Sequence, residues 1–283
     1  MRFASDKYIE LIVENKFNEA DEYRKSFIPD FLYKFVPLRS ETTEEAQREN
    51  QKRLDSLEKG EIWFSSRALM NDPYEFIGMY IDESKLLKDG WPPEAVAAVQ
   101  DKAKNLLFLS SLTSNVYNNM PMWAHYANNH KGYCVKYKVE NKNCIYEVFY
   151  TDRRYSIGHG ISKLLAYSKM IEDKSLAPEK RRDAESKINQ CLEMLRMMYV
   201  IKHSSWSYEN EFRIFCDAAP CGTFGKNVPA KCVGLQPAEV FCGKNCSETN
   251  VEKIIEISKR INIECSRCDI SPTDFCILST HSK

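Results

Sequence analysis

One segment late in the chain alternates polar and apolar residues like a strand with two different faces, Tyr208-Glu-Asn-Glu-Phe-Arg-Ile214. A period of two puts the large apolar side chains on one side of such a strand and the charged ones on the other. The charged set is Glu209, Glu211 and Arg213. The apolar side must be covered by a second layer, so the segment requires a sheet with at least one buried face. We predict a strand over Tyr208–Arg213.

The remainder of the chain mixes short apolar runs with helical patterns in no regular alternation. We expect strands near 32–36, 61–65, 106–110 and 133–139, and helices over 5–27, 42–58, 122–130 and 249–260. Two charged helices on either side of Pro178 predict a helical hairpin at about 159–203. This order favours the α+β class, with a mixed or antiparallel sheet core, helical cover and an inserted helical hairpin. We expect an N-terminal helix over residues 1–30 and a single α+β domain over residues 31–283.

Charge and hydropathy indicate which classes of partner the protein does not attract. The 40 acidic and 40 basic residues cancel, so no overall field attracts nucleic acid or an anionic membrane. No apolar run approaches the roughly 18 residues that a membrane span needs, and residues 1–10 carry charges where a signal peptide needs an apolar core. We therefore expect no membrane partner and a cytoplasmic location.

The 11 cysteines are an odd number scattered from Cys134 to Cys276, so we expect reduced thiols that are mostly buried as small apolar residues. Two close pairs, Cys242-x3-Cys246 and Cys265-x2-Cys268, have the spacing of a four-thiolate zinc site. A whole predicted helix lies between the pairs and no knuckle glycine follows the second one. We do not expect zinc.

The charged side of the Tyr208–Arg213 segment is the first candidate site. Two carboxylates and a guanidinium along one strand suit acid–base chemistry or the stabilisation of a developing cation. The alternative is a solvated strand face with a cross-strand ion pair. No phosphate-binding loop, dinucleotide-binding glycine pattern, His-Glu-x-x-His or Gly-x-Ser-x-Gly motif occurs in the sequence.

Two further motifs offer polar or aromatic groups. In Met122-Trp-Ala-His-Tyr-Ala127, Trp123 and Tyr126 share one side of a helix and leave His125 on another. These aromatic residues form either a ligand platform or part of the core.

The second motif is Asn71-Asp-Pro-Tyr-Glu75, which has turn chemistry. Its Asp72 and Glu75 are able to hold a metal or a ribose hydroxyl, and the alternative is that Asp72 caps a helical turn beginning at Pro73.

Six motifs in order resemble the bacterial domain-of-unknown-function family numbered 2971, over about residues 31–280. They are Leu32-Tyr-Lys-Phe, Ile62-Trp-Phe-Ser-Ser, Asn71-Asp-Pro-Tyr-Glu, Met122-Trp-Ala-His-Tyr-Ala, His130-Lys-Gly-Tyr-Cys-Val and Trp206-x-Tyr-Glu-Asn-Glu-Phe-Arg. The layout of these motifs is also similar to that of ADP-ribosyltransferases, and related sequences are linked with abortive defence against phage.

The ADP-ribosyltransferase resemblance implies a role for each matching residue. Glu211 would stabilise the oxocarbenium-like centre formed on cleavage of NAD, Glu209 would orient the acceptor, and Arg213 would grip phosphate or hold Glu211. His125 completes the predicted catalytic set. The residues expected to bind NAD, with Arg213, are Tyr33, Lys34, Arg39, Ser65, Ser66, Asn71, Asp72, Glu75, Trp123 and Tyr126. The sequence departs from that class on its first strand, where Tyr33-Lys34 stands in place of a His or Arg and Arg39 follows Pro37.

The leading expectation is an NAD-consuming ADP-ribosyltransferase-like enzyme or NAD glycohydrolase, acting as a bacterial stress or phage-defence effector. Its partners would be NAD or a related nucleotide and an unknown protein or nucleic-acid acceptor; the sequence does not indicate an oligomeric state. One alternative is a metal-dependent nuclease or phosphodiesterase with Asp72, Glu75, Glu209 and Glu211 as ligands. Another is a non-enzymatic sensor of a ligand or phage protein, which presents exposed helices.

Overall fold

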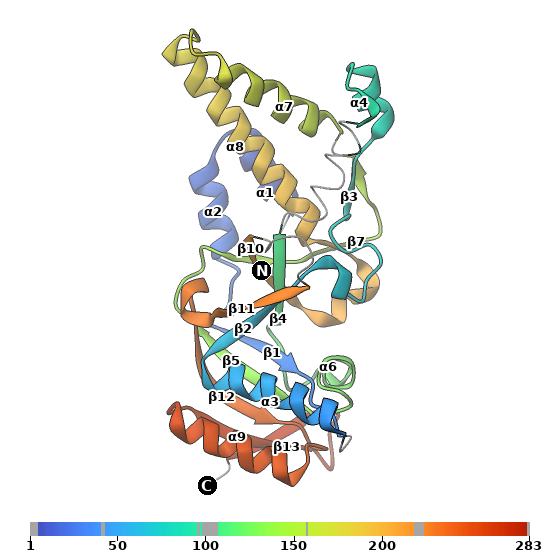
Figure 1. Ribbon diagram of the computed structural model, residues 1–283, viewed down its shortest axis with the longest axis vertical. Coiled ribbons are helices and arrows are strands. Elements are labelled where there is room, and N and C mark those ends of the chain that lie inside the picture. The colour runs from blue at the N-terminus through green and yellow to red at the C-terminus, as the bar shows by residue number, and fades with distance from the viewer. Residues whose placement is uncertain are drawn as a thin grey trace. The chain divides into compact units, whose positions relative to one another are not determined.

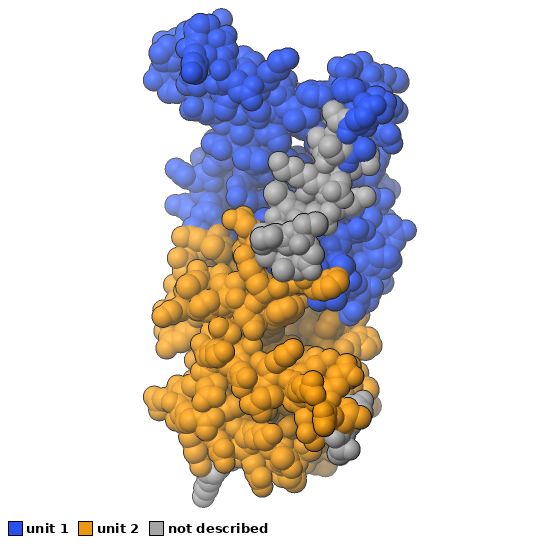
Figure 2. Space-filling view, in the orientation of Figure 1, with its two compact units in different colours: residues 1–27, 66–108, 146–206 blue, residues 28–65, 109–145, 207–283 orange. Residues whose placement is uncertain are grey.

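The computed structural model describes residues 5–40, 43–94, 97, 107–156, 158–217 and 224–281 (Figure 1). The chain forms two compact units, each assembled from three segments (Figure 2). Unit 1 comprises residues 1–27, 66–108 and 146–206, and unit 2 comprises residues 28–65, 109–145 and 207–283. The expected division into an N-terminal helix over 1–30 and a domain over 31–283 stays a prediction, because compactness does not establish which segments fold independently.

Unit 2 is built on a mixed sheet whose strands follow the order β11-β2-β4-β1-β5-β12-β13-β14, with β10 beside β4 and β6. The bounds are β1 Phe31–Val36, β2 Glu61–Ser65, β4 Leu107–Thr113, β5 Tyr133–Val139, β6 Ile145–Glu147, β10 Glu211–Asp217, β11 Gly225–Pro229, β12 Leu235–Cys242, β13 Glu264–Ile270 and β14 Ile277–His281. β12 and β13 run parallel, whereas β1 is antiparallel to both β4 and β5. The predicted α+β class with a mixed sheet is confirmed.

Helices cover this sheet. α3 (Glu44–Glu58) packs on α9 (Glu248–Arg260), and α9 packs on β12 and β13 (Figure 1). The side chain of Thr43 caps α3 by accepting from the Ala46 amide, 3.2 Å away, and satisfies one of the free N–H groups at the start of the helix. α6 (Met120–Tyr126) lies against β1, and a short 3-10 turn, η3 (Ala230–Val233), precedes β12.

Unit 1 is mainly helical. Its elements are α1 Ser5–Val13, α2 Phe17–Lys25, η1 Arg67–Leu69, β3 Met79–Tyr80, α4 Glu83–Lys88, β7 Phe149–Thr151, β8 Tyr155–Ser156, α7 Gly158–Glu172, α8 Pro178–Val200 and β9 Ile201–His203. α7 and α8 run side by side (Figure 1), so the predicted helical hairpin is confirmed. The single helix expected over residues 5–27 is wrong. Asn15 takes a left-handed φ of 58° and separates α1 from α2.

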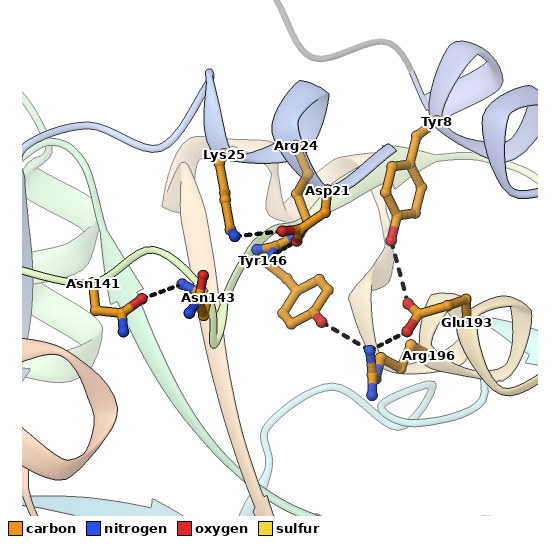
Figure 3. A network of polar contacts seen from close by, with 9 residues as sticks. All are labelled: Tyr8, Asp21, Arg24, Lys25, Asn141, Asn143, Tyr146, Glu193 and Arg196. Carbon is orange, nitrogen blue, oxygen red and sulfur yellow. Dashed lines mark hydrogen bonds and ion pairs between the residues drawn. The ribbon is translucent and has the colours of Figure 1, made fainter. Parts of the chain in front are cut away.

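A polar network ties α1 and α2 to α8 (Figure 3). Tyr8 Oη donates to Glu193 Oε2 over 3.4 Å, and Glu193 pairs with Arg196. Arg196 Nη1 in turn donates to Tyr146 Oη over 3.1 Å. The guanidinium of Arg24, only 3% exposed, lies 4.2 Å from the centre of the Tyr146 ring. A cation–π contact therefore replaces part of the water that Arg24 loses on burial.

Two other expectations concern thiols and membranes. The ten cysteines that the structure describes are free thiols, and six of them are buried. Among the helices in the described ranges, none is both long and apolar enough to cross a bilayer.

Gly132 is required by a close approach between two backbones. A Cβ atom on Gly132 would lie 2.0 Å from the Val36 carbonyl oxygen and 2.9 Å from Pro37 Cα. We predict that Gly132→Ala lowers the free energy of unfolding by about 3 kcal/mol, because the end of β1 must shift. Chemical denaturation measures this loss.

Gly60 supplies the matched control, because a Cβ there has open space but φ is 62°. Gly60→Ala should cost only about 1 kcal/mol, from backbone strain alone. Equal losses for the two variants would contradict the close approach at Gly132.

Candidate functional site

The segment that carries the two candidate carboxylates is a 3-10 turn followed by a strand. The turn η2 covers Ser204–Glu209, Asn210 has a left-handed φ of 44°, and β10 begins at Glu211. The predicted strand over Tyr208–Arg213 is therefore wrong in its first half. Glu209 lies on the turn, and only Glu211 and residues beyond it follow the strand period.

Glu211 and Arg213 form an ion pair inside unit 2. Arg213 Nε donates to Glu211 Oε1 over 2.8 Å, and Arg213 Nη2 donates to Glu211 Oε2 over 2.9 Å. The two residues are 3% and 1% exposed. The apolar face of β10 is buried as well, so the alternative of a solvated strand face is wrong. A carboxylate held by both its oxygens in a water-poor setting keeps one orientation.

Lys34 of β1 lies near this pair. Its side chain is half-buried, and Nζ donates to the Ser111 carbonyl over 3.2 Å. Burial lowers the pKa of Lys34 to about 8, although the negative charge of Glu211 acts in the opposite direction. An electrostatic interaction thus connects the first strand of the sheet with β10.

Side chains from α6 and from its N-cap hold the turn before β10. Tyr126 Oη donates to Glu209, and Asn119 Nδ2 donates to the Tyr208 carbonyl. His125, which is exposed, places Nδ1 3.1 Å from Tyr208 Oη. Glu209 is 3% exposed, so the hydroxyl of Tyr126 offsets part of the loss of water around its carboxylate. The structure therefore brings His125 and Tyr126 to the turn that carries Glu209.

Trp123 belongs to the core. It is fully buried, its Nε1 donates to the Val116 carbonyl over 2.9 Å, and its ring meets Phe35 edge-on at 4.9 Å. The ring also stacks on His130. Every side of the indole is occupied by protein, which leaves no face for a nicotinamide ring. Trp123 is therefore part of the core and not of a ligand platform.

The predicted binding residues on β1 and β2 do not converge on one point. Tyr33 and Lys34 are consecutive in a strand, so their side chains leave it on opposite sides. Tyr33 packs with Phe241 at 6.2 Å, and burial raises its pKa to about 12. Ser65 accepts from Trp63 Nε1 over 2.8 Å.

Arg39 pairs with Glu49 of α3 at 2.9 Å. Only Lys34 among the predicted residues of β1, β2 and the segment after β1 is seen to interact with Glu211.

The other predicted binding residues lie in unit 1. Asp72 caps its own turn, since Oδ1 accepts from the Tyr74 amide over 2.9 Å. Glu75 is 3% exposed and its Oε2 lies 3.8 Å from Lys202 Nζ. Asn71 is exposed and Ser66 is half-buried. All four residues therefore belong to a different unit from Glu211.

Within the described ranges, no group of three or more His, Cys, Asp or Glu side chains is arranged to hold a metal ion. Cys242 and Cys265 place their Sγ atoms 4.0 Å apart. The four carboxylates of the nuclease alternative divide equally between the two units. That alternative stays a prediction.

The sequence does not predict three contacts of the site, which are made by Asn119, Tyr208 and Ser111. Asn119 lies at the end of an Asn-rich loop, and Asn residues in loops often bond to nearby backbone groups. This composition is the sequence signal for the contact of Asn119. The period of two predicts Tyr208 on the apolar side of a strand, away from polar contacts. Ser111 contributes its backbone carbonyl, for which no side-chain pattern exists.

Comparison with known families adds one finding. Residues 122–214 match the family described as "Protein of unknown function (DUF2971)". The resemblance to family 2971 is thereby confirmed over this range. The DUF2971 segment runs from α6 to β10 and includes His125, Tyr126, Glu209, Glu211 and Arg213. No curated protein and no solved structure matches the chain.

The buried pair predicts an unequal response to single and double substitution. Arg213→Met should lower the free energy of unfolding by about 3–5 kcal/mol, because it leaves the Glu211 carboxylate buried without its cation. The double variant Glu211→Leu/Arg213→Met should recover most of that loss, since neither member of the pair is left buried without its partner. Denaturant titration of both variants measures the coupling between them.

Arg260 provides the exposed control, because it pairs with Glu58 at 2.7 Å with both side chains well exposed. Arg260→Met should change stability by less than about 1 kcal/mol. If the double variant Glu211→Leu/Arg213→Met were as unstable as Arg213→Met, the unpaired Glu211 carboxylate would not be the cause of the instability of Arg213→Met.

Lys34 predicts a rise in stability with pH. Its pKa is near 8 in the folded chain and close to 10.5 when unfolded, so the unfolded state binds more protons between these values and unfolding becomes less favourable as pH rises. Relative to Lys34→Met, the parent should gain stability from pH 8 to pH 10.5 and show a constant difference below pH 7. Urea titrations across this pH range give the difference; a flat difference would contradict the lowered pKa.

Proposed function

We propose that the site around Glu211 in unit 2 cleaves the bond between nicotinamide and ribose in NAD. The observation that supports this proposal is the approach of Lys34, from the first strand, to Glu211, whose carboxylate is held by both oxygens by Arg213. A rigid carboxylate beside a cation suits a substrate that carries both a ribose hydroxyl and phosphates.

The chemistry depends on charge that develops during bond breaking. As the glycosidic bond opens, positive charge accumulates on the ribose, and a carboxylate that accepts a hydrogen bond from a ribose hydroxyl stabilises it. Arg213 fixes Glu211 before substrate arrives, so little reorganisation is needed during the reaction. Glu211 is only 3% exposed. Substrate access therefore requires the surrounding side chains to open.

The step balances as a transfer of ADP-ribose. The bond from C1′ to the nicotinamide nitrogen breaks and its electron pair leaves with nicotinamide. An acceptor oxygen bonds to C1′ and passes its proton to Glu209, which the Tyr126 hydroxyl holds in place. With water as acceptor the protein is an NAD glycohydrolase, and with a protein or nucleic acid it is a transferase.

In a bacterial cytoplasm, either reaction would lower the NAD supply or modify a target. We therefore propose a role as a stress or phage-defence effector. The match of residues 122–214 to DUF2971 supports a shared site in that family, since the segment holds both carboxylates and Arg213.

The test is the release of nicotinamide from NAD labelled in both halves, with water alone and with bacterial protein and RNA extracts as acceptors. We expect release by the parent protein and a fall of at least about 100-fold for Glu211→Gln, which keeps the shape but loses the charge. Chromatography of both labelled halves distinguishes hydrolysis from transfer.

Glu264→Gln is the control, because Glu264 is an exposed residue of β13, and it should react like the parent. Circular dichroism establishes that each variant is folded. Absence of release from the folded parent under every acceptor condition would overturn the proposal, as would full activity of Glu211→Gln.

A further inference from the structure

The Asp72 loop of unit 1, residues 66–80, is held in an unusual backbone conformation. Arg67 Nε donates to the Glu75 carbonyl over 2.9 Å and closes it. Phe76, fully buried and edge-on to Tyr199 at 5.2 Å, has a φ of 62°. A left-handed φ at a bulky residue costs roughly 1–3 kcal/mol and persists where the surrounding structure enforces it, often at binding sites.

The loop buries an acceptor that lacks a partner. Asp72 is 5% exposed, and its Oδ1 accepts from the Tyr74 amide. Its Oδ2 is buried and has no hydrogen-bond partner in the part of the chain that the structure describes; the same holds for Ser66 Oγ. An unpaired buried carboxylate oxygen is unfavourable by about 1–3 kcal/mol or more. A ligand that donates a hydrogen bond to Asp72 Oδ2 would remove that penalty.

The charges around Asp72 favour a neutral donor over a metal ion. The neighbouring carboxylate of Glu75 already faces Lys202, whose Nζ is 3.8 Å from Glu75 Oε2 and which is itself only 7% exposed. Arg67 adds a second cation at the loop. Hydroxyl groups satisfy a carboxylate oxygen without adding charge, whereas a divalent cation needs several oxygen ligands.

A layer of aromatic rings lies on the outside of the same loop. Tyr74 and Tyr80 are 53% and 41% exposed. The guanidinium of Arg154 lies 5.6 Å from the centre of the Tyr74 ring and 5.5 Å from that of Tyr80. Arg154 Nε donates to the Ile77 carbonyl over 2.9 Å, which fixes the guanidinium against the loop. Tyrosine rings and an arginine plane are the usual surfaces on which a nucleobase stacks.

We propose that the Asp72 loop binds a ribonucleoside, with its base on the layer formed by Tyr74, Tyr80 and Arg154 and a ribose hydroxyl donating to Asp72 Oδ2. This site uses unit 1 residues alone. It does not depend on Glu211 or on the cleavage of NAD.

The test compares adenosine with 2′,3′-dideoxyadenosine, which lacks both ribose hydroxyls, by isothermal titration calorimetry on the full chain. The parent should bind adenosine about tenfold more tightly, as expected for one hydrogen bond to a charged acceptor. Asp72→Asn keeps the turn acceptor at Oδ1 and replaces the charged Oδ2 with an amide NH2. This variant should lose most of the discrimination between the two nucleosides while remaining as stable as the parent.

Asp82→Asn is the matched control in the same unit, because Asp82 caps α4 by accepting from the Lys85 amide. It should retain the tenfold preference. Tyr74→Ala should weaken both nucleosides equally. Equal binding of the two nucleosides by the parent, absence of adenosine binding, or full discrimination by Asp72→Asn would each overturn the proposal.

Discussion

The ion pair of Glu211 and Arg213 is buried inside unit 2, and its burial affects both the stability of the sheet and the chemistry that the sheet can support. Burying a carboxylate and a guanidinium is unfavourable unless each has a partner, and here both oxygens of Glu211 receive a hydrogen bond from Arg213. Lys34 adds a third charge in the same region, with its pKa lowered by burial. The pair thus holds the Glu211 carboxylate in a fixed orientation in the sheet. Catalytic and structural carboxylates share this property.

The turn before β10 connects this pair to α6. Asn119 and Tyr126 contact the backbone carbonyl of Tyr208 and the carboxylate of Glu209, so α6 fixes the point at which β10 starts. The match to DUF2971 includes α6 and the first residues of β10. A helix and a strand more than 80 residues apart therefore act together through side-chain contacts at one turn.

Local sequence patterns predicted the elements that have a clear apolar pattern and a glycine or proline at their ends. The strand at residues 61–65 and the hairpin of α7 and α8 follow from an apolar run with a bounding glycine and from helical spacing around a proline. The turn at Asn210 was not predictable, because the alternation of residues 208–214 fits a strand throughout. Its left-handed backbone is accompanied by long-range hydrogen bonds, including one from the Ser114 amide to the Asn210 carbonyl. The sequence does not predict the burial of Glu211 and Arg213. A Glu and an Arg two residues apart form the same pattern on a solvent-exposed strand face and on a buried one.

The interleaving of the two units limits how this protein can be divided. The chain passes from one unit to the other after residues 27, 65, 108, 145 and 206, so neither unit is a continuous stretch of polypeptide. The matched range 122–214 takes in parts of both. A truncation of residues 1–27 would remove one segment of unit 1, and a truncation after residue 206 would remove one segment of unit 2. An excised piece that follows the family boundaries would lack segments of both units. Contacts between residues distant in sequence also slow folding, and a ribosome must release most of the chain before unit 2 has all its strands.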